Sequence, residues 1–336
     1  MRLLIVALVL GGCTEPEPYE VPQKPGKTTS STTTGSGTTT WTTSTTPTTT
    51  PPTVSTNGLY VYDCSQPNPQ VTGISSVGTY GPAEDFDFDA NGNAIQVFSS
   101  NLTYRNKTGD SSGVITPGIS SNAAGTRVLA DGDYVVADVS SGEVLLVDHT
   151  TGAASTLFAA PSWPNGIEID RDGYLYVSDF TGGSIVRFDP YDVTDNETIA
   201  TGMNLPNGLA LSPDEQILYV AGSGGDLFRI FRDPTTGAWD SGELFLSPGS
   251  SPQGINVDIC GNVYWTDGTD RILRWDVDNG QVDEVAELQS GYLPNLRWGS
   301  GVGGWEVDHL YASDRFAEEM FEIPVGIPGQ MHVMYE

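Results

Sequence analysis

Short alternations of apolar and polar residues fill the chain from residue 58 onward, and turns rich in glycine and aspartate separate them. The stretch from 162 to 190 contains three such runs, around Ile167, Val177 and Val186. Alternation with a period of two, interrupted by turn residues, is typical of short antiparallel strands. One such unit cannot bury its own apolar face, so a stable domain needs several copies.

The unit recurs along the chain at a nearly constant spacing. Similar stretches begin near residues 82, 123, 205, 251 and 293. The residues that align with Asn165 are separated by steps of 40, 41, 42, 46 and 42 and are Glu84, Ala124, Asn165, Asn207, Gln253 and Asn295. Six units of about four strands predict an all-β fold, a six-bladed β-propeller of four-stranded blades.

The strand needed to close the ring is predicted near the start of the domain. The last unit ends soon after Met320–Pro324 and lacks an outer strand, while an unassigned apolar segment precedes the first unit. Because a propeller must protect its edge strands, we expect Leu59–Tyr62 to pair with Met320–Pro324.

The first 57 residues are of a different kind. Residues 1–12 contain one arginine and a short apolar run, which predicts a cleaved signal peptide because the run is too short to span a bilayer. The ending Leu-Gly-Gly-Cys resembles the lipobox of bacterial lipoproteins, which implies acylation of Cys13. Residues 13–57 are rich in Thr, Ser and Pro and predict a disordered tether, followed by the propeller at 58–336. We therefore expect a lipid-anchored protein of the bacterial cell envelope. Its expected location is the outer membrane or the cell surface, and the periplasm is the alternative.

The charge of the chain excludes one class of partner. The formal net charge is −29, and residues 58–336 carry 11 Lys and Arg against 40 Asp and Glu. Nucleic acids and anionic lipid surfaces need clustered cations, so we expect neither as a partner, and contact with the membrane only through the anchor. The acidity is explained either by solvated turns or by attraction of cations.

Two cysteines remain besides Cys13. An oxidising compartment permits a disulfide between Cys64 and Cys260, and two buried thiols are the alternative.

The six aligned residues form the candidate site. The first strand of each propeller blade lines the central channel, so these residues should converge there. One carboxylate and four amides form an oxygen-rich set suited to a hard cation such as Ca²⁺. Alternatively, the amides serve turns, since Pro-Asn-Gly is a good turn sequence. Four aspartates end the second strands near the same face: Asp138, Asp179, Asp267 and Asp314.

Three segments carry a family resemblance: WPNGIEIDRDGYLYVSD, LPNGLALSPDEQILYVAG and PAEDFDFDANGNA. They resemble the gluconolactonase, senescence-marker-protein and luciferin-regenerating-enzyme family. The resemblance implies a six-bladed propeller with a divalent ion, usually Ca²⁺, held in the channel, and hydrolysis of lactones or phosphotriesters at that ion.

The resemblance also implies a set of metal ligands. The family's metal-binding Glu falls on Glu84 and its two channel Asn residues on Asn165 and Asn207. The fourth position, usually Asp, is Gln253 here. A Gln can coordinate through its carbonyl oxygen but cannot accept a proton, so the site keeps one carboxylate and we expect weaker cation binding.

Two functions follow as expectations. The first is an extracytoplasmic, Ca²⁺-dependent hydrolase of a lactone or related ester, monomeric, with no catalytic base assigned. Its substrate contacts would be Asn295, Asp179, Asp267 and Arg297, although Arg297 also suits a structural ion pair. The second is a non-catalytic, membrane-tethered propeller that binds a protein or glycan partner, which Gln253 and Ala124 favour.

Overall fold

The computed structural model of the protein describes residues 53–54, 60–159, 162–288 and 291–330. The predicted signal peptide, Cys13 and most of the predicted tether lie outside these residues. Within the described residues, every regular element is a β-strand. No helix among them is long and apolar enough to cross a membrane.

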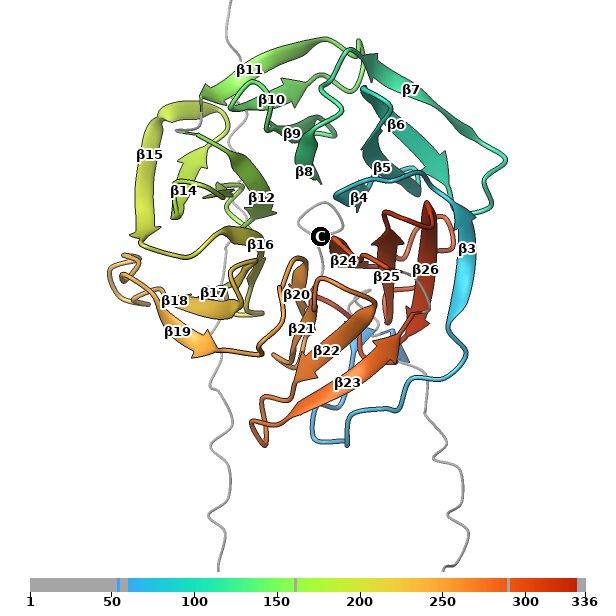
Figure 1. The fold of residues 1–336 in the computed structure, drawn as a ribbon, viewed down its shortest axis with the longest axis vertical. Helices are drawn as coiled ribbons and strands as arrows, with labels where there is room; N and C mark the ends of the chain where they lie inside the picture. The colour runs from blue at the N-terminus through green and yellow to red at the C-terminus, as the bar shows by residue number, and fades with distance from the viewer. Residues whose placement is uncertain (1–52, 55–59, 160–161, 289–290, 331–336) are drawn as a thin grey trace, which may run out of the picture. The chain divides into compact units, whose positions relative to one another are not determined.

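Six four-stranded antiparallel sheets are arranged as the blades of a propeller around a central channel (Figure 1). The strands of the first three blades, each from the inside outward, are β4 (Phe86–Phe88), β5 (Asn93–Phe98), β6 (Asn101–Asn106) and β7 (Ser112–Pro117); β8 (Ala123–Val128), β9 (Tyr134–Asp138), β10 (Glu143–Val147) and β11 (Ala154–Ala159); and β12 (Pro164–Ile169), β13 (Leu175–Asp179), β14 (Ser184–Asp189) and β15 (Asp192–Thr201).

The other three blades repeat this order, except that the sixth takes its outer strand from the start of the domain. Their strands are β16 (Pro206–Leu211), β17 (Ile217–Gly222), β18 (Asp226–Phe231) and β19 (Glu243–Leu246); β20 (Ile255–Val257), β21 (Val263–Thr266), β22 (Arg271–Trp275) and β23 (Val282–Glu287); and β24 (Asn295–Trp298), β25 (His309–Asp314), β26 (Glu319–Pro324) and β3 (Ser75–Thr79). The predicted six-bladed propeller of four-stranded blades is confirmed.

The strand that closes the ring is not the expected one. β3 pairs antiparallel with β26, with Thr79 opposite Glu319, and lies on the outer edge of the sixth blade (Figure 1). The predicted pairing of Leu59–Tyr62 with Met320–Pro324 is therefore wrong. Tyr60–Val61 instead forms β2, which pairs with β1 (Thr53–Val54) in a separate two-stranded sheet. Closure by a segment from the start of the domain was correct, but its position was not.

The core lies between the blades. Six clusters of buried apolar side chains each join two neighbouring blades. Between the second and third blades, for example, Val135 and Val144 pack with Ile167 and Leu175, all of which are fully buried. Each blade is thus stabilised on both faces by its neighbours, which explains why a single unit of the repeat cannot fold alone.

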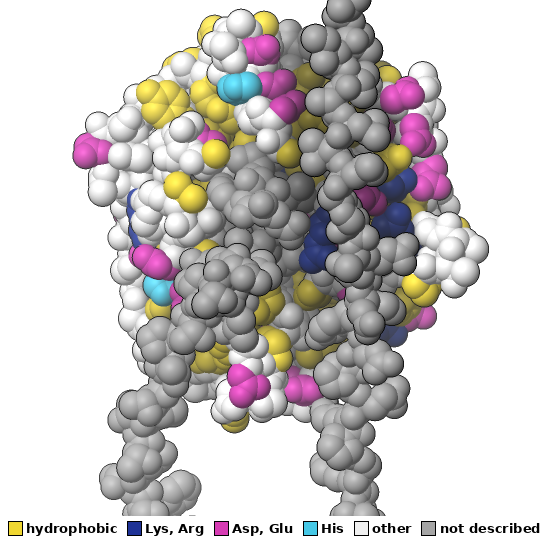
Figure 2. All heavy atoms as spheres, turned by 180° about the vertical axis from the view of Figure 1, so that it is seen from behind, with side chains coloured by type: hydrophobic (Ala, Val, Ile, Leu, Met, Phe, Trp, Pro, Cys, Tyr) yellow, Lys and Arg dark blue, Asp and Glu magenta, His cyan; other side chains and the backbone are white. Residues whose placement is uncertain are grey.

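Acidic side chains of the exposed turns lie outside these apolar clusters. Figure 2 shows Asp and Glu in small groups scattered around the edge of one face, interspersed with neutral and apolar side chains. Carboxylates in the exposed turns accept hydrogen bonds from backbone amides, as Asp148 does from Thr150 and Thr151. Solvated turns therefore account for this part of the negative charge.

A disulfide fastens the segment before β3 to the fifth blade. Cys64 and Cys260 are bonded, with their Cα atoms 5.4 Å apart. Asn68 adds a hydrogen bond from its Nδ2 to Asp276 Oδ2 of 2.8 Å. The chain is thereby anchored on the fifth blade before it supplies the outer strand of the sixth.

Reduction of this disulfide should destabilise the protein. The bridge joins residues separated by 196 positions, so its loss releases a long loop in the unfolded chain, and we expect the free energy of unfolding to fall by about 3–5 kcal/mol. Denaturant unfolding with and without reductant measures the change. The double variant Cys64→Ser/Cys260→Ser is the control, and a midpoint in the parent that reductant leaves unmoved contradicts the expectation.

Candidate functional site

The six aligned residues meet at one mouth of the channel. Each lies at or just before the start of an inner strand, and five line a common hollow: Glu84, Ala124, Asn165, Asn207 and Asn295. Gln253 joins them through a hydrogen bond from Asn207 Nδ2 to its Oε1 of 2.7 Å. All except Glu84 are at least nine-tenths buried, and the Glu84 side chain is 18% exposed.

The Pro-Asn-Gly sequences are not turns. Pro164 and Pro206 begin the strands β12 and β16, and in both strands the register shifts just after the proline, around Asn165 and Asn207. The same irregularity occurs around Ala124 in β8. A bulge re-aims the side chain at that position, so these residues face the channel as a consequence of local strand geometry, and the interpretation of the asparagines as turn residues is wrong.

The glycine after each of these residues has a packing role. A Cβ atom on Gly166 would lie 2.1 Å from the backbone oxygen of Asn207 in the next blade, and one on Gly208 would lie 2.5 Å from that of Gln253. Gly125 and Gly254 are equally confined against Asn165 and Asn295. The glycines therefore let neighbouring inner strands approach closely, which narrows the mouth of the channel.

Tyr292 contacts two of the aligned residues, Glu84 and Gln253. Its hydroxyl lies 3.3 Å from Glu84 Oε1 and 3.4 Å from Gln253 Oε1, so one donor is shared between them. Burial, and then the negative charge of Glu84, raise the pKa of Tyr292 above its usual value. The hydroxyl therefore stays protonated, so it is a neutral group that can donate one hydrogen bond.

Arg315 occupies the other oxygen of the same carboxylate. Its Nη1 pairs with Glu84 Oε2, and its backbone N–H donates to the carbonyl of Tyr292 at 3.0 Å. Burial raises the pKa of Glu84, while Arg315 and the Tyr292 hydroxyl oppose the shift. Both oxygens of the ring's only carboxylate thus have partners from the loops of the sixth blade.

The predicted substrate-contacting residues fall into two groups. Asn295 and Arg297 line the hollow. Asp179 and Asp267 are buried beneath the loops at the same mouth, where Asp179 Oδ1 accepts from Ser162 Oγ at 2.5 Å and Asp267 Oδ2 from Arg271 Nε at 2.7 Å. These two carboxylates hold turns together and do not line the hollow.

A layer of buried charges lies deeper in the channel. Arg127 Nη1 is 2.6 Å from Asp85 Oδ2, and Arg297 lies 3.8 Å from Asp85 Oδ1 and 3.4 Å from Glu168 Oε2. Burial raises the pKa of Asp85 to about 6 and that of Glu168 to about 7, although Arg127 opposes both shifts. The arginines on the inner strands are thus members of structural ion pairs, with Arg297 also reaching the hollow.

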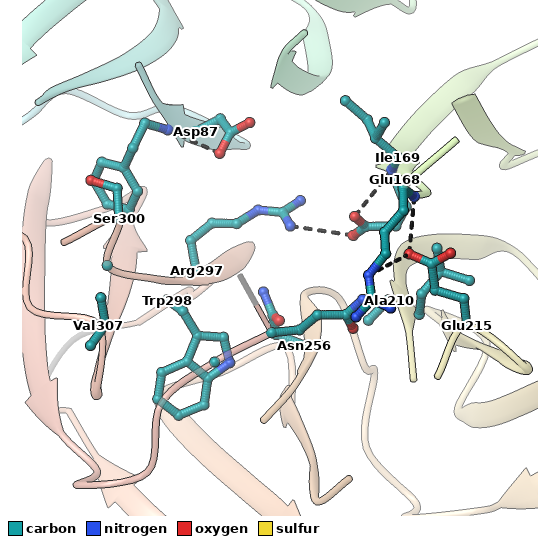
Figure 3. Close-up of a pocket in the computed structure, with 16 residues that line it drawn as sticks. Asp87, Glu168, Ile169, Ala210, Glu215, Asn256, Arg297, Trp298, Ser300 and Val307 are labelled. Atoms are coloured by element: carbon teal, nitrogen blue, oxygen red, sulfur yellow. Dashed lines mark hydrogen bonds and ion pairs between the residues drawn. The ribbon is translucent and has the colours of Figure 1, made fainter. Parts of the chain in front are cut away.

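A larger cavity, of about 60 Å³, opens at the opposite end of the inner strands. Figure 3 shows Arg297 extending across it toward Glu168. Glu215, which also lines the cavity, pairs with Arg171 at 3.7 Å. Glu168 also accepts a hydrogen bond from the backbone of Ile169 at 3.1 Å. Arg297 lines both openings, so the charged layer separates this cavity from the hollow around Glu84.

The donor set can be tested against a divalent cation. Glu84, Asn165, Asn207 and Gln253 offer one carboxylate and three amide oxygens at one place, which is the chemistry that hard cations prefer. Among the described residues, no three His, Cys, Asp or Glu side chains form a group that could hold a metal ion. The residues therefore fit a cation in ligand type, with little negative charge to attract it.

Aromatic side chains border the same mouth on opposite sides of the ring. Trp163 and Phe180 of the third blade have ring centroids 5.8 Å apart, and Tyr292 and Phe316 of the sixth blade 5.7 Å apart. All four precede an inner strand or follow a second strand, which places them beside the aligned residues. Phe316 is 74% exposed, so the mouth offers apolar surface around a polar floor.

Tyr292 and Arg315 were not predicted from the sequence. Neither aligns with a ring position, and neither belongs to a recognisable motif. The available signal was positional: residues just before the inner strand and just after the second strand of a unit must lie at the same mouth as the ring. Only one unit carries a tyrosine and an arginine there, so the repeat itself gave no reason to select them.

The sequence profile described as "SMP-30/Gluconolactonase/LRE-like region" matches residues 100–311, which is more than half of the chain. A pentonolactonase of Haloferax volcanii is 27% identical over 206 residues, covering 56% of this chain and 66% of the relative. A gluconolactonase of Zymomonas mobilis is 27% identical over 178 residues, covering 42% of this chain and 48% of the relative. The chain thus spans less than two thirds of each.

Solved structures show the same fold. A protein described as the calcium-binding protein regucalcin, from Agrobacterium tumefaciens, superposes with a TM-score of 0.63 at 17% identity. The superposition covers 80% of this chain and 98% of that one. At this identity the likeness concerns the fold alone.

The buried carboxylate of Glu168 predicts a pH dependence of stability. Its pKa rises from an ordinary value of 4.5 to about 7 in the folded state. Below about pH 4.5 both states are protonated, and as pH rises to about 7 the unfolded state ionises first, so stability is lost. We expect Glu168→Gln to match the parent at pH 4.5 and to exceed it at pH 8 by up to about 3 kcal/mol.

Denaturant unfolding at both pH values measures this difference. Glu287→Gln, on the exposed edge strand β23, is the control and should follow the parent at both. Equal stability of parent and Glu168→Gln at pH 8 would show that Glu168 ionises as easily in the fold as in water.

Proposed function

Because the chain belongs to the SMP-30/gluconolactonase/LRE-like family, we propose that it is a lactonase-type hydrolase whose active site is the hollow around Glu84. The observation that carries the proposal is the convergence of the Glu84, Asn165, Asn207 and Gln253 side chains at one mouth of the channel. Relatives described as a pentonolactonase and a gluconolactonase support a sugar lactone as the substrate class.

The reaction adds water to the lactone carbonyl and breaks the ring C–O bond, which yields a hydroxy acid. We assign Glu84, Asn165, Asn207 and Gln253 to hold a divalent cation, Ca²⁺ by preference, and its chemistry would be to polarise the carbonyl and stabilise the oxyanion. We assign the Tyr292 hydroxyl, which stays protonated, to transfer its hydrogen bond from Glu84 and Gln253 to a substrate oxygen. Gln253 cannot accept a proton, so it positions and does not act as a base.

The mouth of the channel is proposed to receive the substrate over its aromatic border. Sugar rings present apolar C–H faces that pack on aromatic side chains, while their hydroxyls need polar partners. Phe316 and Trp163 offer aromatic surface for the sugar ring. Asn295 and Arg297 offer polar groups for its hydroxyls. The two requirements are met on the border and on the floor of one site.

We also propose that the protein acts outside the cytoplasm, anchored through Cys13. The disulfide between Cys64 and Cys260 supports an oxidising compartment, because such bonds are rare where thiols are kept reduced. Mass determination of the membrane-extracted protein tests the anchor. A mature chain that begins elsewhere or lacks acyl groups contradicts it.

Lactone hydrolysis is the direct test of the activity. On a panel of aldonolactones and unsubstituted lactones, we expect the parent to be active and to lose activity with EDTA. Glu84→Gln should lower kcat/KM by 100-fold or more, because it removes the ring's only carboxylate. Tyr292→Phe should lower it by about tenfold, as expected for loss of one positioned donor.

A matched control exists for the tyrosine variant. Tyr191 is 67% exposed, and its hydroxyl donates to Asp131 in the turn between β8 and β9, so Tyr191→Phe removes an equivalent group with no expected effect on hydrolysis. Activity that survives both EDTA and Glu84→Gln contradicts the proposed site. A folded parent without activity on any lactone favours a propeller that binds a partner without catalysis.

A further inference from the structure

We propose that Arg315 competes with the divalent cation for the Glu84 carboxylate and thereby sets the cation affinity of this site. The inference rests on the proposed cation site and concerns a residue outside its ligand set. Arg315 pairs with Glu84 Oε2, while Tyr292 lies against Oε1. A cation on this carboxylate would lie beside the guanidinium, and the repulsion between the two positive groups opposes its binding.

The charge balance of the site explains why Arg315 would have a large effect on cation affinity. Gln253 is a neutral amide and the other aligned residues carry no charge, so Glu84 is the one acidic member of the ring. The next carboxylate, Asp85, is held by Arg127 at 2.6 Å. With Arg315 in place, the ring therefore presents no net negative charge to an incoming cation.

The position of Arg315 allows it to leave without disturbing the fold. Its side chain is 40% exposed, so water can solvate the released guanidinium. The backbone beside it is fixed separately, because Asp314 Oδ1 accepts from the amides of Phe316 and Ala317 at 2.8 Å each. Release of the Glu84 carboxylate from Arg315 thus requires only a rotation of one side chain at the mouth of the channel.

Removal of the arginine charge should strengthen cation binding. We expect Arg315→Gln to lower the Kd for Ca²⁺ at least tenfold relative to the parent, and the gain to shrink as salt is added. Arg315→Lys keeps a positive charge and should stay within about threefold of the parent. Glu84→Gln combined with Arg315→Gln should lose the gain, because the contested carboxylate is gone.

The experiment is calorimetric titration of the full chain with Ca²⁺ at low ionic strength, with thermal unfolding used to check each variant. Arg229→Gln is the matched control: it makes the same change in net charge, but Arg229 pairs with Glu243 on the outer strands of the fourth blade, at 2.6 Å. A tighter Kd for Arg315→Gln than for both parent and Arg229→Gln supports the proposal.

Two outcomes overturn it. If the parent binds Ca²⁺ in a Glu84-dependent manner and Arg315→Gln binds no more tightly, the competition is absent while the cation site stands. If neither protein binds Ca²⁺, the competition and the cation site both fail. Lactone hydrolysis by the same preparations then shows separately whether the proposed activity survives.

Discussion

Closure of the ring is the constraint on which the rest of the structure depends. The six apolar clusters lie between blades, so the last of them exists only when the sixth blade stands against the first. That cluster, with Phe88 packed against Trp305 at a centroid distance of 4.6 Å, is completed by a blade whose outer strand comes from the other end of the domain. The pairing of β3 with β26 covers the outer edge of the sixth blade and joins the two ends of the domain in one sheet, which closes the ring.

The candidate site is a product of the same closure. Glu84 belongs to the first blade, whereas Tyr292 and Arg315 belong to the sixth, and these residues meet only across the junction between them. The four glycines narrow the mouth elsewhere around the ring by letting inner strands approach. Glu84 is then the one acidic side chain among the six aligned residues, so its partners Tyr292 and Arg315 determine the charge that the ring presents.

The sequence was most informative where the repeat enforced a regular pattern. Spacing and alternation predicted the number of blades, the inner strands and the convergence of the aligned residues. The closing strand was misplaced because an outer edge strand is defined by backbone pairing: β3 reads Ser-Ser-Val-Gly-Thr and is less apolar than the segment that was chosen. Pro-Asn-Gly was misread because a glycine required for close approach looks the same in sequence as one required for a turn.

The pairing of β3 with β26 also has a consequence for how the molecule is made. The two strands stand near opposite ends of the domain, so during synthesis the first must wait until nearly all of the chain has emerged. Contacts of such long sequence separation slow folding, since loop-closure entropy must be overcome before they form. The disulfide holds the segment leading to β3 on the fifth blade, beside the sixth blade that β3 completes. Residues from both ends of the domain must therefore come together before the sixth blade, and with it the site around Glu84, is complete.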